Sequence, residues 1–279
     1  MSWLEALILG LVQGLTEFLP VSSSGHIELG KALLGVEVGG DIAFEVVVHA
    51  ATALATILVF RKEIGAIFRG LFRFRWNDDT DYFFKLLVSA LPIGVVGIAF
   101  CGPIKRLFES DAVIPVVGVA LLATAALLFF SDRKVRNGSG NPPPADAEGA
   151  AARNGITLRQ AFLVGCGQAL AIVPGLSRSG TTISVGLLCG VRREVVASFS
   201  FLMALAPILG KTVLDASSGD LTASSAGAPA LAVGFAAAFV SGLFACKAMI
   251  ALVKRARLVW FALYCVVVGL AALAAHRFA

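Results

Sequence analysis

Charged residues are scarce in this chain of 279 residues: they make up 15% of it, against roughly 25% in a typical soluble domain. Hydrophobic residues make up 58%, and the mean hydropathy is +0.87. Several apolar runs reach about 20 residues, the length that a helix needs to cross a bilayer core. These runs are continuous rather than alternating, which argues against a transmembrane β-barrel. The chain is therefore predicted to be an all-α polytopic membrane protein without a soluble domain.

Cysteine is also sparse, and the five cysteines include no Cys-x-x-Cys pair, so neither a zinc site nor a disulfide framework is indicated. The net charge is only +5, and most positive residues lie in short loops beside apolar runs, where membrane topology accounts for them. Nucleic-acid binding is not expected. The apolar start at residues 6–12 lacks a cationic flank, so we expect no cleaved signal peptide.

Two polar stretches stand out in this apolar chain, and they are similar to each other. They cover residues 10–26 and 165–181. In each, a Gly is followed three positions later by a Gln (Gln13 and Gln168), then by an apolar run, a Pro, a serine-rich turn and a Gly. Unpaired polar groups in hydrocarbon are costly, so this concentration predicts a functional site.

The breaks between apolar runs predict the order of the helices. Each polar stretch separates two arms that are short for a span, which is typical of re-entrant hairpins in corresponding halves of a membrane protein. The predicted arms are 3–19 and about 26–34, then 157–173 and about 181–190. The predicted full spans are 42–60, 82–101, 112–130, 194–214, 229–252 and 258–275.

Each half is thus one hairpin plus three spans. Because three is odd, the second half enters from the opposite side, and the chain is predicted to be an inverted repeat with six spans and two re-entrant hairpins. The two polar tips, one with Glu17 and the other with Arg178, are expected to meet in the membrane interior. We expect a single membrane domain over 1–279, with a first repeat at 1–131, a cytoplasmic linker at 132–156 and a second inverted repeat at 157–279. Fully spanning arms remain the alternative, and they would not invert the halves.

The distribution of basic residues predicts the orientation. Basic residues gather on four segments, which are 61–75, 131–159, 192–193 and 254–257. The loops 35–41 and 216–227 carry none. With re-entrant hairpins, all four basic segments fall on one face, which is cytoplasmic by the positive-inside rule. Both termini then lie outside.

The second polar stretch has the composition of an oxyanion site. Arg178 offers a permanently charged fork suited to phosphate oxygens. Ser177, Ser179 and Thr182 supply hydroxyl donors, and a helix that begins beside them would point its positive end at the same place. The plainer alternative is a helix N-cap with an arginine that extends to the membrane surface.

The first polar stretch has the parts needed to activate a nucleophile or to ligate a metal. Gln13 and Glu17 are four residues apart and share a helix face. His26 follows the turn, and the turn itself holds Ser22, Ser23 and Ser24. A solvated Glu17 and a His26 bonded to backbone are the alternatives.

Three further polar residues are candidates for supporting roles. Glu45 and His49 form another pair four residues apart, inside a predicted span. We expect Glu45 either to position Arg178, to help hold a cation, or to make a structural hydrogen bond. Gln168 is expected to pair with its repeat partner Gln13.

These motifs resemble the signatures of the bacterial undecaprenyl-diphosphate phosphatase family, also known as bacitracin-resistance proteins. The chain reads L-V-Q-G-L-T-E-F-L-P-V-S-S-S-G-H and P-G-L-S-R-S-G-T-T at the two stretches, with F-E-V-V-V at 44–48 and F-S-F-L-M-A at 199–204. The resemblance implies a multi-pass enzyme of the bacterial cytoplasmic membrane, with its active site toward the outer face. It would remove the terminal phosphate of undecaprenyl diphosphate and so recycle the lipid carrier for cell-wall synthesis.

The resemblance also implies roles for the site residues. Glu17 is a metal ligand or general base for a divalent cation, Mg²⁺ or Ca²⁺. Ser23 is a candidate nucleophile, and His26 either activates it or is itself the nucleophile. Arg178 holds the diphosphate, aided by Ser177 and Ser179. Further candidates for substrate binding are Ser22, Ser24 and Thr182. Gln13, a weaker metal-ligand candidate, stands where the family pattern also allows a Glu, and His49 stands where a Gln is expected.

Two other classes of function remain open. Inverted repeats with broken helices also build transporters, so a carrier or flippase for a phosphorylated lipid or another anion is the alternative. A channel is less favoured. Besides the polyprenyl diphosphate and membrane lipids, a second copy of the chain is a possible partner, because Gly and Ala in the last two spans would permit helix association. The same small residues also suit packing within one chain.

Overall fold

The computed structural model describes residues 1–36, 42–108, 110, 112–137, 155–217, 227–255 and 257–278. Over these residues the chain forms twelve α-helices and no strand, so the all-α prediction is confirmed. The helices are α1 Trp3–Thr16, α2 Ser23–Leu34, α3 Ile42–Val59, α4 Arg61–Leu71, α5 Asp78–Ala99, α6 Cys101–Phe108, α7 Val113–Arg136, α8 Leu158–Leu170, α9 Arg178–Leu188, α10 Arg193–Ser217, α11 Ala228–Arg255 and α12 Val259–Phe278.

Five of the described helices are long and apolar enough to cross a membrane: α5, α7, α10, α11 and α12. The predicted span 42–60 corresponds to α3, which passes the same test only together with α4, and the two are bent by 74° at Phe60. Five spans, or six if the bent pair is one span, therefore match the predicted number. The arms of the two hairpins are the short helices α1 and α2, and α8 and α9.

Three predicted loop regions are partly helical. The segment 61–75 contains α4 and the segment 102–111 contains most of α6. The predicted start of the linker 132–156 is too early, because α7 continues through Arg136. Arg133 and Lys134 lie in the last turn of α7, where the helix dipole stabilises positive charge. Buried Asp132 also ties this end down through Arg193. The rest of the predicted linker, 138–154, lies outside the described residues.

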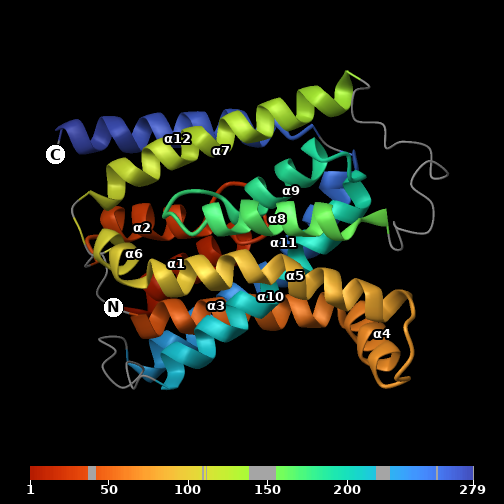
Figure 1. The fold of residues 1–279 in the computed structure, drawn as a ribbon. Helices are drawn as coiled ribbons and strands as arrows, with labels where there is room; N and C mark the ends of the chain where they lie inside the picture. Colours follow the sequence, from red (N-terminus) through yellow and green to blue (C-terminus); the bar gives the residue numbers. More distant parts are fainter. Residues whose placement is uncertain are drawn as a thin grey trace.

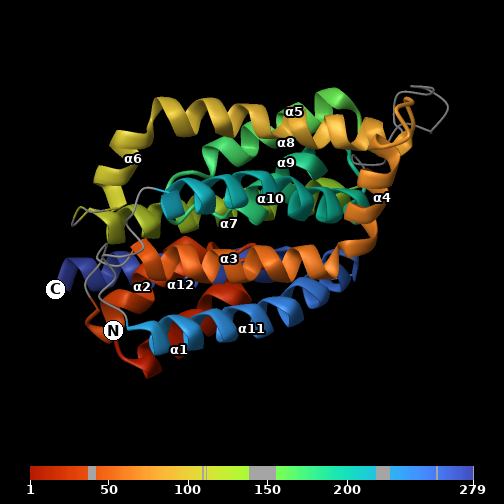
Figure 2. The ribbon, with the colours of Figure 1, turned by 90° about the horizontal axis from the view of Figure 1, so that it is seen from below.

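The helices lie side by side along a common direction (Figures 1 and 2). Both termini lie at one end of the bundle, and α4 lies at the other end. The last turn of α7, the start of α8, the end of α11 and the start of α12 share the α4 end (Figures 1 and 2). Where they are described, these segments with basic clusters therefore lie at one end of the molecule, as the charge pattern predicts.

Small residues let two helix pairs approach closely. A Cβ on Gly10 of α1 would lie 2.5 Å from the carbonyl oxygen of Gly234 in α11. A Cβ on Gly118 of α7 would lie 3.0 Å from the carbonyl oxygen of Gly269 in α12. Glycines of the last two helices thus serve packing within one chain, which is one of the two roles left open by the sequence.

Candidate functional site

The first hairpin turns sharply between α1 and α2. We call residues 17–26 the first tip. Glu17 is the C-cap of α1, and Ser22 is the N-cap of α2, where its hydroxyl accepts a hydrogen bond from Gly25 N at 3.3 Å. Ser22 has φ 71°, a left-handed conformation that few non-glycine residues adopt. This strained turn brings the side chain of Ser23 back toward the end of α1.

The second hairpin turns between α8 and α9. We call residues 171–182 the second tip. Gly175 has φ 87°, and a Cβ there would lie 2.5 Å from Cα of Val117 in α7, so only glycine fits. Ser177 is the N-cap of α9, and its hydroxyl accepts a hydrogen bond from Gly180 N at 3.1 Å. Arg178 therefore stands at the first turn of α9.

The two tips meet inside the molecule. The Arg178 guanidinium donates to the Glu17 carboxylate, and their side chains are 19% and 5% exposed. Ser179 Oγ donates to the carbonyl oxygen of Leu19 at 3.0 Å. A Cβ on Gly25 would lie 3.1 Å from Cα of Gly175. An ion pair, a hydrogen bond and a backbone approach thus join residues that are far apart in the sequence.

Glu17 is the centre of this arrangement. One of its carboxylate oxygens binds Arg178, and the other accepts hydrogen bonds from Ser23 Oγ at 2.6 Å and from Gln13 Nε2 at 2.9 Å. A hydroxyl that donates to a carboxylate over this distance is placed to lose its proton to it. The Ser23 hydroxyl and the Glu17 carboxylate therefore form a hydrogen-bonded pair at the first tip.

His26 is bonded at both ring nitrogens. Its Nδ1 lies 2.8 Å from the carbonyl oxygen of Ser22, and its Nε2 lies 2.8 Å from the hydroxyl of Tyr264 in α12. The His26 and Tyr264 rings are stacked, with centroids 5.6 Å apart and planes at 11°. His26 thus combines a bond to backbone, which was one sequence-based alternative, with a side-chain partner from the other end of the chain.

The remaining hydroxyls of the tips take part in local structure. Ser22 Oγ and Ser24 Oγ lie 3.4 Å apart, as do Ser177 Oγ and Ser179 Oγ. Thr182 Oγ1 donates to Arg178 O at 2.9 Å and lies 2.5 Å from Ser200 Oγ in α10. Their predicted contacts with a substrate remain predictions.

A family model described as "Bacitracin resistance protein BacA" matches residues 6–271. This chain belongs to the bacitracin-resistance family. A protein of Parabacteroides distasonis named "Undecaprenyl-diphosphatase" is 49% identical over 278 residues, covering 98% of each chain. A protein of the same name from Bacteroides thetaiotaomicron is 47% identical, over 97% of this chain and 98% of the relative. Another from Methanosphaera stadtmanae is 33% identical, over 96% and 95%.

One sequence-based contact is wrong in this bacitracin-resistance family member. Gln168 does not pair with Gln13: the side-chain amide of Gln168 is fully buried with no hydrogen-bond partner, and Gln13 donates to Glu17 instead. Of the alternatives for Glu45, the structure shows the structural hydrogen bond between helices, because Glu45 of α3 binds Lys31 of α2. The repeat predicts that Gln13 and Gln168 occupy equivalent positions in the two halves. A hydrogen bond between them would also need their polar atoms to lie within about 3 Å, which the repeat does not determine.

The sequence analysis missed a buried charge cluster beside the first tip. Lys31 of α2 is 1% exposed, and its Nζ contacts Glu45 of α3 and, at 3.3 Å, Glu28 of α2. His49 Nδ1 lies 2.8 Å from the carbonyl oxygen of Glu45. The spacing of Glu28 and Lys31, three residues apart in a short apolar arm, was the available signal.

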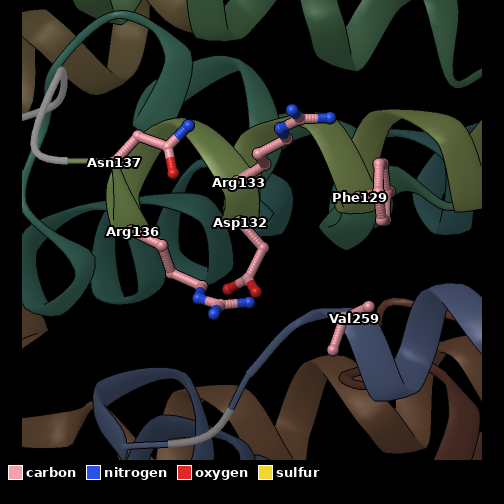
Figure 3. A pocket seen from close by; sticks show the side chains of 6 residues that line it. All are labelled: Phe129, Asp132, Arg133, Arg136, Asn137 and Val259. Carbon is pink, nitrogen blue, oxygen red and sulfur yellow. The ribbon is translucent and has the colours of Figure 1, made fainter.

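Two features of α12 were also missed. Tyr264 is one of only two tyrosines in the chain, and the sequence pattern assigned it no role. A second feature is a cavity of about 290 Å³ between the last turn of α7 and the start of α12, lined by Phe129, Asp132, Arg133, Arg136, Asn137 and Val259 (Figure 3). This cavity lies beside basic residues in the last turn of α7, not at the tips.

The donor set at the first tip fits a divalent cation that takes further ligands from phosphate and water. Gln13 Oε1 is buried without a hydrogen-bond partner, on the side chain whose Nε2 bonds the Glu17 carboxylate. Among the described residues, no group of three or more His, Cys, Asp or Glu could hold a metal alone. Mg²⁺ commonly binds through one or two protein oxygens plus substrate phosphate, so the available ligands suit that mode.

Proposed function

We propose that this protein hydrolyses undecaprenyl diphosphate to undecaprenyl phosphate and phosphate, and so recycles the lipid carrier. The relatives that cover nearly the whole chain are named for this activity. The observation that carries the proposal is the junction of the two tips, where Arg178 binds the same carboxylate that accepts the Ser23 hydroxyl. A transporter or flippase is not favoured, because an activated nucleophile has no use in a carrier.

In the proposed reaction, Arg178 and the start of α9 hold the diphosphate in line with Ser23. Ser23 Oγ attacks the terminal phosphorus while its proton passes to Glu17, and the bond to the bridging oxygen breaks, releasing undecaprenyl phosphate. Water then attacks the phosphoserine, and His26 Nε2 gains a proton in this step. Ser23 recovers a proton from Glu17 as phosphate leaves.

The expected divalent cation would be held by Glu17 and Gln13 Oε1. When bound, such an ion neutralises phosphate charge and polarises the phosphoryl oxygens. The protein's own residues still do the positioning, because phosphoryl transfer depends mainly on alignment and charge neutralisation.

We further propose that the protein is an inverted repeat with two re-entrant hairpins in the cytoplasmic membrane. The packing partners of equivalent helices support this proposal. The first arm of each hairpin packs on a helix of the other half: α1 packs on α11, and α8 packs on α5. The last helices of the two halves, α7 and α12, pack on each other. The first hairpin begins and ends at the bundle end with both termini, and the second begins and ends at the α4 end (Figure 1). With the basic end cytoplasmic, both termini and the mouth of the first hairpin face outward.

The proposal is tested by phosphate release from a polyprenyl diphosphate in detergent micelles. Glu17→Gln and Arg178→Ala are expected to lower kcat/KM by at least about 100-fold, since each removes charge that is matched to the transition state. Arg75→Ala, which removes an exposed arginine at the far end, is the control and should keep wild-type activity. Wild-type rates in both site variants would contradict the site assignment.

The nucleophile is tested separately by trapping the phosphorylated enzyme during turnover. Acid quenching followed by peptide mapping should find phosphate on Ser23 and no trapped phosphate in Ser23→Ala. Phosphate on His26 instead would overturn the roles given to these two residues while leaving the overall reaction intact.

A further inference from the structure

The contacts of His26 determine where its ring proton lies. A carbonyl oxygen only accepts hydrogen bonds, so the 2.8 Å contact between Nδ1 and Ser22 O requires the proton on Nδ1. In the neutral ring, Nε2 then carries the lone pair and accepts from the Tyr264 hydroxyl at 2.8 Å. Both nitrogens are thus committed, and Ser23 is bonded to Glu17 instead.

The position of α12 makes this contact part of the fold rather than a chance surface pair. Cys265, next to Tyr264, donates from Sγ to the carbonyl oxygen of Pro20 in the first tip at 3.6 Å. α12 is itself held against α7 through the close approach of Gly118 and Gly269. Two successive residues of α12 therefore rest on the first tip.

We propose that Tyr264 holds the His26 ring in the Nδ1–H tautomer and passes the proton of the attacking water to Nε2, because its own hydroxyl proton is already bonded to that nitrogen. This rests on the proposed function. Stacking fixes the plane of the ring, and the hydroxyl and Ser22 O together fix its rotation and tautomer. In this step the water oxygen bonds phosphorus and the Ser23 Oγ–phosphorus bond breaks. The water proton passes to the Tyr264 oxygen while the Tyr264 hydroxyl proton passes to Nε2, so Tyr264 ends the step as a neutral phenol.

The kinetic test uses Tyr264→Phe, which keeps the ring and removes the hydroxyl. Loss of this proton path is expected to lower kcat at least about tenfold. KM should not rise, and the steady-state fraction of phosphorylated Ser23 should increase because only its hydrolysis is slowed. Tyr82→Phe is the matched control: it removes the only other tyrosine hydroxyl, from a ring packed against Phe199, and should change neither quantity.

Three kinetic results would overturn the inference. These are an unchanged kcat in Tyr264→Phe, a loss that comes wholly from a higher KM, and a lower kcat without extra phosphoserine. An equal loss in Tyr82→Phe would also overturn it, because the effect would then be general. If the wild-type protein releases no phosphate at all, the proposed function fails, and the Tyr264 contact is judged by the spectroscopic test below.

The spectroscopic test needs no activity. The chain has three histidines, so ¹⁵N-histidine labelling gives three pairs of ring resonances, and His26→Gln identifies the pair of His26. We expect a protonated Nδ1 and an unprotonated Nε2 in the wild type. The Nε2 resonance should shift in Tyr264→Phe and stay in place in Tyr82→Phe. A protonated Nε2 in the wild type, or no shift in Tyr264→Phe, would refute the assignment.

Discussion

At the scale of single residues, the cluster around Lys31 places three charged groups in the interior of the protein. The Lys31 ammonium is almost fully buried between Glu28 and Glu45, and Glu28 Oε2 has no hydrogen-bond partner. Burying charges costs several kcal/mol per ion, and the attraction between them offsets this only while the set is complete. The cluster joins α2 to α3 and so holds α2, the second arm of the first hairpin, in place.

Lys31→Met should therefore destabilise the protein by about 3 kcal/mol or more, because it leaves two carboxylates buried without a counter-charge. Denaturant unfolding in detergent micelles measures the change in free energy. Lys62→Met is the control: it removes an exposed lysine of α4 and should change the free energy of unfolding by less than about 0.5 kcal/mol. Equal effects of the two variants would show that the buried ion pairs contribute nothing.

At the scale of elements, glycine decides which helices cross closely. α1 approaches α11 where Gly14 faces Ser241 and the carbonyl oxygen of Ala238, and a Cβ on Gly14 would overlap both. This contact places the C-terminal end of α1, and with it Glu17, against the second half of the chain. The packing of one helix pair thus supports the geometry of the site.

Gly14→Ala is expected to cost at least about 2 kcal/mol, since the new methyl group meets backbone that cannot rotate away. Gly94→Ala in α5 is the matched control, because nothing lies within 4 Å of a Cβ built there. A solvent- or lipid-facing helix glycine replaced by alanine should be neutral or stabilising by up to about 1 kcal/mol. Thermal unfolding of both variants decides the matter, and a tolerated Gly14→Ala would mean that α1 and α11 separate readily.

At the scale of the whole molecule, the two ends of the bundle differ in charge. The end with α4 carries the described parts of the basic segments. The end with both termini carries fewer basic residues, among them Lys105 and Arg106 of α6 (Figures 1 and 2). This difference is the basis of the proposed orientation, since basic loops stay on the cytoplasmic side. In that orientation the first hairpin, which supplies Glu17 and Ser23, would open toward the outer side.

Single-cysteine reporters in a cysteine-free background test the orientation. Ala228→Cys at the start of α11 should react with a membrane-impermeant maleimide in right-side-out vesicles. Phe74→Cys, after α4, should react only in inside-out vesicles. Both positions are exposed, so access alone does not favour either one. The reverse pattern would contradict the proposed orientation and place the first hairpin on the cytoplasmic side.

Much of the site could be read from the sequence because local chemistry determines it. Ser177 caps α9 and Ser22 caps α2, as serine-rich turns predict, and Gly175 has the positive φ that its residue type allows. The meeting of Glu17 with Arg178 was predicted from the repeat. The partners of Glu45 and Gln168 were not, since they depend on which neighbouring helix comes within about 3 Å.

The sequence by itself determined the class of protein, the two helical hairpins and the residues of their tips. These features depend on local properties of the chain, which are its apolar content, its helix breaks and its two polar stretches. Only the tertiary structure decided that Ser23 bonds Glu17 while His26 bonds Tyr264, and that Lys31 joins α2 to α3. The reason is physical: hydrogen bonds and buried ion pairs act over a few ångströms between segments whose separation is set by helix packing. No pattern along the chain encodes that separation directly.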